Sequence, residues 1–489
     1  MRVDRVHARP LDIKANHALD AVQRCYPNAR GGACMAGTDI NPAQVTKPPA
    51  LPAGIVRKTV VIIALNLACY VVMYCLNAVL ARVMSTRDYG MYGLIVNTLI
   101  TIGTFALFGF DDTSEFFISV YASLKKHDLL RGFFQFLAKI FVFVATPFVL
   151  ISLVFIVVSF MQGKLSSREE ALKLIEASHP LVLFIWIAPF LGAMACLEAV
   201  LYALGAQIQT LVYRGIVGPL VMLIFIGGYY YLFGREHMHY AVYAYCFSIL
   251  VTIGLQAATI VRRIPTVVWA EKPKRVVKTW VTYAIPIFFC DLIYFGIDTS
   301  VMGEMHLFHV NKEYLGLYMA ISSISGYFLV SIMSSIASVF EVYIGPLWEQ
   351  KDFRSVQSLI NKALAFSIGF CALFCLFVVI AGHKLLENFG PGYVEAYPAL
   401  LIYTISASLN AGTIIWQSLL KFTDNVKYLL KVYIAGFVVL LIGVGFGCYR
   451  QWSLDKILWA YAAFQVVTLL VCIYYVRKAA RPISLIPVL

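Results

Sequence analysis

Residues 58–82 read KTVVIIALNLACYVVMYCLNAVLAR, and this stretch decides the class of fold. Between Lys58 and Arg82 the stretch contains no charged residue. A helix of about 20 apolar residues is long enough to cross the hydrocarbon core of a bilayer, which is roughly 30 Å thick. Because only its ends are charged, the stretch predicts a membrane-spanning helix.

Eleven similar apolar runs follow along the chain. Together with the first they predict spans at 58–82, 90–121, 133–160, 180–204, 211–234, 239–261, 281–303, 314–345, 359–382, 395–420, 429–449 and 456–477. Of the 489 residues, 61% are hydrophobic and 13% are charged, which is more apolar than a typical soluble domain. The expected fold is therefore an all-α polytopic membrane protein with 12 transmembrane helices.

The distribution of lysine and arginine predicts the orientation of these spans. An even number of spans places both tails on one side, and the loops on that side are the richer in Lys and Arg. Residues 1–57 are basic, rich in proline and without the apolar core of a signal peptide, so we expect a disordered cytoplasmic tail. Residues 478–489 form the second cytoplasmic tail. The net charge of +13 then reflects membrane topology and does not indicate a nucleic-acid partner.

Segment 262–280 differs from the other loops because basic residues alternate with valine and tryptophan. We expect an amphipathic linker that lies under anionic lipid headgroups on the cytoplasmic side, although a simple basic loop would give a similar pattern. The segment divides the spans six and six. This predicts an N-terminal lobe at 58–261 and a C-terminal lobe at 281–477.

A weak internal repeat supports this division. Gly90-Met91-Tyr92 opens the second span and Gly316-Leu317-Tyr318 opens the eighth, an offset of 226 residues. The same offset relates Glu115 to Glu341. An even number of spans in each half gives parallel repeats, and such repeats commonly enclose a central site between two lobes.

Several motifs occur in a fixed order along residues 57–478. They are Leu80–Gly93, Phe108–Asp111, Leu130–Gly132, Pro286, Asp298, Gly316–Ala320, Leu386–Tyr393 and Ala396–Leu401. In this order they resemble the polysaccharide (O-antigen type) lipid-linked oligosaccharide flippases of the MOP transporter superfamily. The resemblance implies two six-helix lobes around a central cavity, and alternating access that moves undecaprenyl-diphosphate-linked glycans to the outer leaflet.

From this resemblance we expect a flippase of the bacterial cytoplasmic membrane that serves surface or exopolysaccharide assembly. Its partners would be the lipid-linked oligosaccharide, membrane lipids, a polysaccharide polymerase and glycosyltransferases. We expect no enzymatic activity and no cofactor, with transport coupled to a proton or sodium gradient. A multidrug or small-cation antiporter of the same superfamily is the nearest alternative. A membrane glycan polymerase or ligase is disfavoured by the short outer loops and the repeat.

Charged residues inside membrane spans are costly and mark candidate functional sites. Asp111 and Glu115 are four residues apart and share a helix face, whereas Asp112 is displaced from it. Asp291 lies five residues after Pro286, which permits a bend, and Asp298 lies seven residues further on. These carboxylates are candidates for ion coupling, and each has an alternative as a hydrogen-bonded or solvated structural acid. Glu115 and Glu341 are candidates for facing each other at a cytoplasmic gate.

Lys139 is the cation expected inside the third span. It is a candidate for attracting the diphosphate of the lipid carrier. The alternative is an ion pair with Glu115 or Glu198, which lie at a similar predicted depth. No metal-ligating cluster and no nucleotide-binding P-loop occurs in the sequence.

Overall fold

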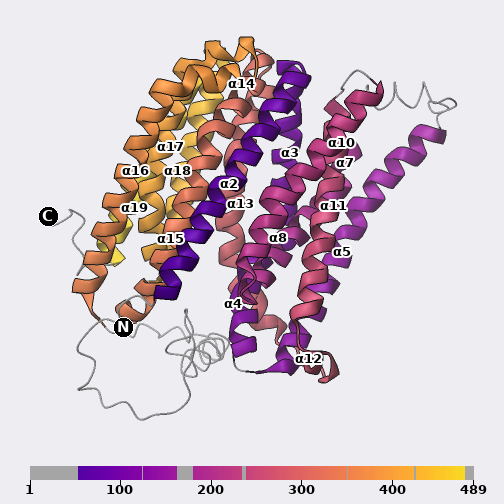
Figure 1. The fold of residues 1–489 in the computed structure, drawn as a ribbon, viewed down its shortest axis with the longest axis vertical. Helices are drawn as coiled ribbons and strands as arrows, with labels where there is room; N and C mark the ends of the chain where they lie inside the picture. Colours follow the sequence, from indigo (N-terminus) through magenta and orange to yellow (C-terminus); the bar gives the residue numbers. More distant parts are fainter. Residues whose placement is uncertain are drawn as a thin grey trace, which may run out of the picture.

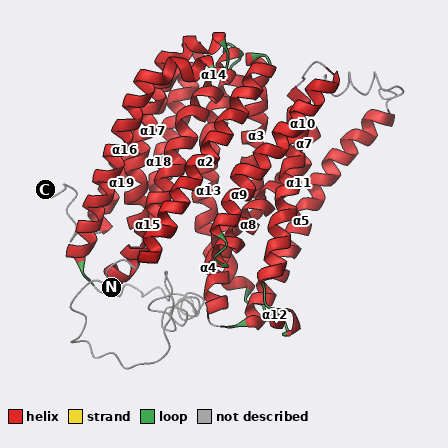
Figure 2. Ribbon diagram, viewed as in Figure 1, coloured by secondary structure: helices red, strands yellow, loops and turns green. Residues whose placement is uncertain are grey.

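The computed structural model describes residues 53–123, 125–161, 180–233, 238–349, 351–422 and 426–479. Over these residues the chain is helical and contains no strand (Figure 2). Most of the two predicted tails lies outside the described residues, as does most of the longest predicted outer loop, 161–178.

The first half of the chain forms the helices from α2 to α12, the short helix of the linker. They are α2 (Ala53–Val83), α3 (Thr86–Leu107), α4 (Phe110–Ser123), α5 (His127–Met161), α7 (Pro180–Phe184), η2 (Ile185–Ile187), α8 (Ala188–Ala203), α9 (Gln207–Val212), η3 (Tyr213–Val217), α10 (Gly218–Phe233), α11 (Met238–Arg263) and α12 (Thr266–Ala270). Within this half, η3 is a π-helical turn inside a longer helix.

The second half follows the linker and repeats this general design. Its helices are α13 (Val277–Leu307), α14 (Glu313–Ile321), η4 (Ser322–Gly326), α15 (Tyr327–Glu349), α16 (Phe353–Glu387), η5 (Pro391–Ala396), α17 (Tyr397–Phe422), α18 (Val426–Tyr449) and α19 (Leu454–Ala479). Here η4 is a second π-helical turn.

Twelve helical stretches in the described residues are long and apolar enough to cross a membrane. They occur at the twelve predicted positions, so the all-helical polytopic fold is confirmed. The ends differ by several residues, as expected for boundaries inferred from hydropathy.

One predicted span is not a single helix. The sequence predicts a continuous helix over 90–121, but α3 ends at Leu107 and α4 begins at Phe110. Phe108 and Gly109 between them both have positive φ, 51° and 70°. A Cβ on Gly109 would lie 2.7 Å from the backbone nitrogen of Phe288 in α13, so close packing requires glycine there.

The linker packs on the protein more than its sequence pattern predicts. Val268 and Trp280 are fully buried, and the indole nitrogen of Trp280 donates to the hydroxyl of Tyr121 at 2.9 Å. Val267 and Trp269 on the same segment are exposed. Only part of the apolar side of 262–280 is therefore available to lipid, because the rest completes the core beneath α4 and α5.

The hydrophobic core shows how the two halves meet. We call the end of the bundle where α3 and α14 begin the α14 end, and the opposite end the α12 end (Figure 1). At the α14 end one large cluster combines buried residues of both halves, among them Tyr89, Leu99, Tyr318 and Phe389. At the α12 end there are two separate clusters: one combines the first half with the start of α13, and the other lies within the second half. The halves thus share one core at the α14 end, whereas toward the α12 end α13 packs with the first half and α15 to α19 form a core of their own.

The repeat-related glycines lie at this junction. A Cβ added to Gly90 would collide with the backbone nitrogen of Gly316, and a Cβ on Gly316 would collide with the carbonyl oxygen of Thr86. Helices α3 and α14 therefore approach backbone to backbone, which only small residues allow. The two GxY motifs found in the sequence are thus the point of closest contact between the two halves.

Candidate functional site

A buried ion pair lies in the first half, about two turns from the α12 end. The guanidinium of Arg214 in η3 donates to the carboxylate of Glu198 in α8 at 2.9 Å. The amide of Gln256 in α11 donates to the other oxygen of the same carboxylate at 3.4 Å. The side chain of Glu198 is 8% exposed, whereas that of Arg214 is 62% exposed. The carboxylate is thus enclosed while the cation remains open on one side.

The π-helical turn η3 helps to place Arg214. A π-helical turn inserts one residue into a helix and often occurs at functional sites. The turn packs against α2, because a Cβ on Gly215 would collide with the Cys69 side chain. The thiol of Cys69 also contacts the carbonyl oxygen of Leu211 at 3.5 Å.

The guanidinium of Arg214 lies near tyrosines of both halves. It lies within electrostatic range of Tyr202 and Tyr245 in the first half and of Tyr294 and Tyr327 in the second. Tyr327 is itself 40% exposed. This guanidinium is open to solvent and has tyrosines of both halves around it. It can therefore bind an anionic solute that enters from the α12 end.

The second π-helical turn, η4, also contacts α2. The hydroxyl of Tyr70 in α2 donates to the carbonyl oxygen of Ile324 in η4 at 2.7 Å. Ser325 of the same turn exchanges a 2.6 Å hydrogen bond with Thr404 of α17. Helix α2 is therefore in contact with an irregular turn in each half, and such turns can change their hydrogen bonding more easily than regular helix.

The structure gives Asp298 a specific partner. Its carboxylate accepts a 2.6 Å hydrogen bond from the hydroxyl of Tyr318 in α14. The ring of Tyr318 packs edge-on against Tyr403, which stacks on Tyr461. The tyrosine cluster extends from Asp298 into the second half, and this arrangement suits a carboxylate that exchanges a proton or holds a cation.

Two of the three acids that follow the break between α3 and α4, Asp111 and Glu115, have different surroundings. Asp111 is half-buried and lies within electrostatic range of Cys196 in α8. Glu115 is exposed and lies within range of Tyr202. Glu115 therefore belongs to the same region as the Arg214–Glu198 pair, which the sequence did not predict.

Asp291 is half-buried in α13 and lies within electrostatic range of Tyr294 and Tyr433. Asp291 and Asp298 both lie within electrostatic range of Tyr294. Pro286 lies inside α13, one turn earlier. The side chains of Asp112 and Glu341 lie outside the described residues, so a gate between Glu115 and Glu341 stays a prediction.

The expected pairing of Lys139 is not present. Glu198 pairs with Arg214, and Lys139 makes no ion pair or hydrogen bond to the residues that the structure describes. The physical reason is that the chain segment after α8 brings Arg214 within 2.9 Å of the Glu198 carboxylate, which is then already paired. Sequence analysis missed Arg214 as a site residue. A signal was available: Glu198, Arg214 and Gln256 are polar residues at similar depth in neighbouring spans.

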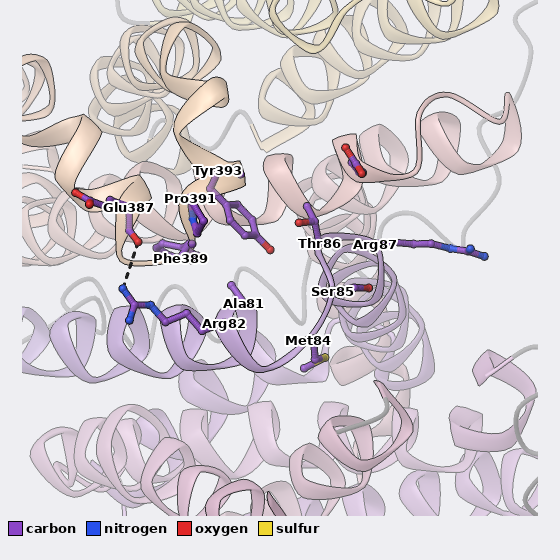
Figure 3. Close-up of a pocket in the computed structure, with 13 residues that line it drawn as sticks. Ala81, Arg82, Met84, Ser85, Thr86, Arg87, Glu387, Phe389, Pro391 and Tyr393 are labelled. Carbon is purple, nitrogen blue, oxygen red and sulfur yellow. Dashed lines mark hydrogen bonds between the residues drawn. The ribbon is translucent and has the colours of Figure 1, made fainter. Parts of the chain in front are cut away.

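A pocket of about 790 Å³ lies at the α14 end (Figure 3). Arg82 of α2 reaches across it and donates to the carbonyl oxygens of Asn388 and Glu387 at 2.7 and 3.3 Å. Asn388 in turn donates to the hydroxyl of Tyr74 at 3.0 Å. These contacts hold α2 against the loop that follows α16, so they close the α14 end.

In the described part of the chain, no group of three or more His, Cys, Asp or Glu side chains could hold a metal ion.

The sequence matches no family model, and no curated protein sequence matches it either. Solved structures do match by fold. An inward-facing MATE multidrug resistance transporter of the MOP superfamily has a TM-score of 0.63 at 12% identity, over 86% of this chain and 99% of the other. An outward-facing MATE transporter of that superfamily has a TM-score of 0.59 at 12% identity, over 88% and 96%.

A mutant of the Vibrio cholerae MATE transporter VcmN has a TM-score of 0.51 at 15% identity, over 86% of this chain and 98% of the other. These likenesses cover nearly the whole of each relative. The chain therefore has a MATE-like fold.

Proposed function

We propose that this protein flips a polyprenyl-diphosphate-linked oligosaccharide from the inner to the outer leaflet of the bacterial cytoplasmic membrane. The MATE-like fold supports a transporter, and the ordered motifs from Leu80 to Leu401 support the flippase branch. The single observation that carries the proposal is Arg214. Its exposed guanidinium between the two halves suits an anionic diphosphate better than a cationic drug.

The glycan needs a polar path, because it cannot cross about 30 Å of hydrocarbon unaided. Arg214 attracts the diphosphate into the space between the halves, and the surrounding tyrosines offer flat faces and hydroxyls to the sugars. The polyprenyl chain stays outside the space between the halves. Closure at the α12 end and opening at the α14 end then exposes the glycan to the other leaflet.

In this proposal, carboxylates couple transport to an ion gradient. Asp298 with its Tyr318 hydrogen bond, together with Asp291, is the candidate for taking up a proton or sodium ion. Neutralising either acid changes the charge at the contact between the halves and so biases which end is open. Glycosyltransferases would supply the substrate at the cytoplasmic face, and a polysaccharide polymerase would consume it outside.

Cation export is the second candidate function. The reported structures of similar fold are MATE transporters, and two of them are described as multidrug resistance transporters. The acids Asp111, Glu115, Asp291 and Asp298 would suit a cationic solute. This candidate predicts that acidic residues alone determine transport and that Arg214 is dispensable.

The test is a deletion strain complemented with the full-length chain and its variants. Arg214→Ala should cause lipid-linked glycan to accumulate and surface polysaccharide to be lost, whereas Arg214→Lys should retain part of the activity. Arg354→Ala, an exposed arginine at the start of α16, is the matched control. Full activity of Arg214→Ala, or drug sensitivity without any change in glycan, would favour cation export instead.

A further inference from the structure

An apolar groove of about 920 Å³ opens between α3 and α5. The end of α3 contributes Phe105, the break contributes Phe108, and α5 contributes the stretch from Ala138 to Leu150. The groove is at the upper end of the size range for small-molecule sites, about 300–1,000 Å³. It is long and apolar, since Val142 and Phe143 on α5 are 61% and 81% exposed along it.

One cation lies in this groove. Lys139 is exposed and makes no ion pair or hydrogen bond with the described residues. The polar segment of the linker contacts α5 up to Gln135, which accepts a 2.8 Å hydrogen bond from Arg275. Lys139 lies one helical turn, roughly 6 Å, further into the apolar part of α5. An ammonium there is costly unless an anion compensates its charge.

The groove borders the contact between the two halves. Phe105 and Phe108 both pack against Phe288 of α13, with ring centroids 5.5 and 5.4 Å apart. Gly109 lies directly against the backbone of the same helix. A molecule in the groove is therefore held at the point where α3 and α4 break and where the second half must move.

We propose that the groove binds the polyprenyl chain of the transported lipid, with its diphosphate on Lys139. This inference rests on the proposed function. A single cation at one end of a single groove fits a lipid with one chain and a strongly anionic head, and it fits a two-chain phospholipid less well. The chain lies along α5 toward Leu150, away from the α12 end, and the lipid is thereby held at the α12 side of the membrane before its glycan enters the space between the halves.

The test measures lipid binding by native mass spectrometry of the purified full-length protein, with undecaprenyl diphosphate and phosphatidylglycerol as the two probes. Lys139→Gln should weaken undecaprenyl diphosphate binding by about tenfold, which is the size expected for one lost charge-assisted contact. Lys139→Arg should preserve it. The matched control is Lys456→Gln, an exposed lysine on α19.

A second variant tests the groove without changing charge. Val142→Trp should fill the groove and weaken binding, whereas Ile368→Trp on α16 should not, since Ile368 is equally exposed on another helix. If Lys139→Gln does not yield folded protein, undecaprenyl diphosphate binding by Val142→Trp tests the inference on its own.

Three results would overturn the inference. The first is unchanged binding in both Lys139→Gln and Val142→Trp; a transport defect in Arg214→Ala would then leave the proposed function in place. The second is a loss of phosphatidylglycerol binding in Lys139→Gln that equals the loss of undecaprenyl diphosphate binding. This result would make the groove a general site for anionic lipid. The third is no binding of undecaprenyl diphosphate by the unaltered protein, and this would also remove support for the proposed substrate.

Discussion

The Arg214–Glu198 pair combines a buried carboxylate with an open guanidinium. Glu198 is enclosed by α8, η3 and α11 and receives hydrogen bonds from Arg214 and Gln256. A buried charge of this kind is tolerated because it is paired and hydrogen-bonded. The exposed side of Arg214 is left for a ligand, so the same pair serves both stability and binding.

We expect Arg214→Ala to lower the free energy of unfolding by about 1–3 kcal/mol, since Glu198 loses its ionic partner while solvent near Arg214 limits the cost. Adding Glu198→Gln should restore stability, because the buried charge is removed. Thermal unfolding in detergent measures both effects. Transport should stay low in the double variant, and recovery of transport together with stability would show that Arg214 acts only structurally.

Asp298 offers a second test on single residues. Asp298→Asn keeps an oxygen that can accept the Tyr318 hydrogen bond but removes the charge. We therefore expect normal insertion and folding with strongly reduced transport. Uptake in vesicles with an imposed proton or sodium gradient measures the effect. Transport by Asp298→Asn that still responds to the gradient as the unaltered protein does would exclude Asp298 as the coupling site.

Helices α3 and α14 form the closest contact between the halves, and glycine makes that contact possible. Gly90 of α3 and Gly316 of α14 each leave room for the backbone of the other helix. By contrast, Gly303 on α13 has open space around its missing Cβ. Whether a position requires glycine therefore depends on how closely the facing helix approaches it.

Gly90→Ala should destabilise the protein by about 1–3 kcal/mol, because the added methyl group forces α3 and α14 apart. Gly303→Ala should change stability little and serves as the control. Thermal unfolding of the two variants under identical conditions gives the comparison. Equal stability of the two variants would show that α3 and α14 can move apart at little cost in free energy.

The two ends of the molecule differ in how the halves pack. One hydrophobic cluster spans both halves at the α14 end, whereas at the α12 end one cluster combines the first half with the start of α13 and another lies within the second half. The contacts of Arg82 with the loop after α16 add polar closure at the α14 end. Arg214 lies nearer the opposite, α12 end, and its side chain is exposed there.

Arg82→Ala should favour opening of the α14 end, because it removes two hydrogen bonds between α2 and the Glu387–Asn388 loop. The readout is maleimide labelling of Ser323→Cys, a buried position at the contact between the halves, in a cysteine-free background. Labelling should increase in Arg82→Ala. Arg87→Ala is the control, since Arg87 lines the same pocket. Equal labelling in both variants would contradict a closing role for Arg82.

Much of the fold follows from sequence because membrane insertion depends on local hydrophobicity. Each span needs only its own run of apolar residues, so all twelve could be predicted. The irregular parts could not. Phe108 adopts a left-handed conformation that disfavours its side chain, and it does so because Gly109 packs on α13 far along the chain.

By itself the sequence determined the helical class, the number of spans and the positions of the charged residues within them. Only the tertiary structure decided that Glu198 pairs with Arg214 and not with Lys139, and that Gly90 meets Gly316. The reason is physical: hydrophobicity acts along one helix, whereas ion pairs and close helix contacts depend on which helices become neighbours.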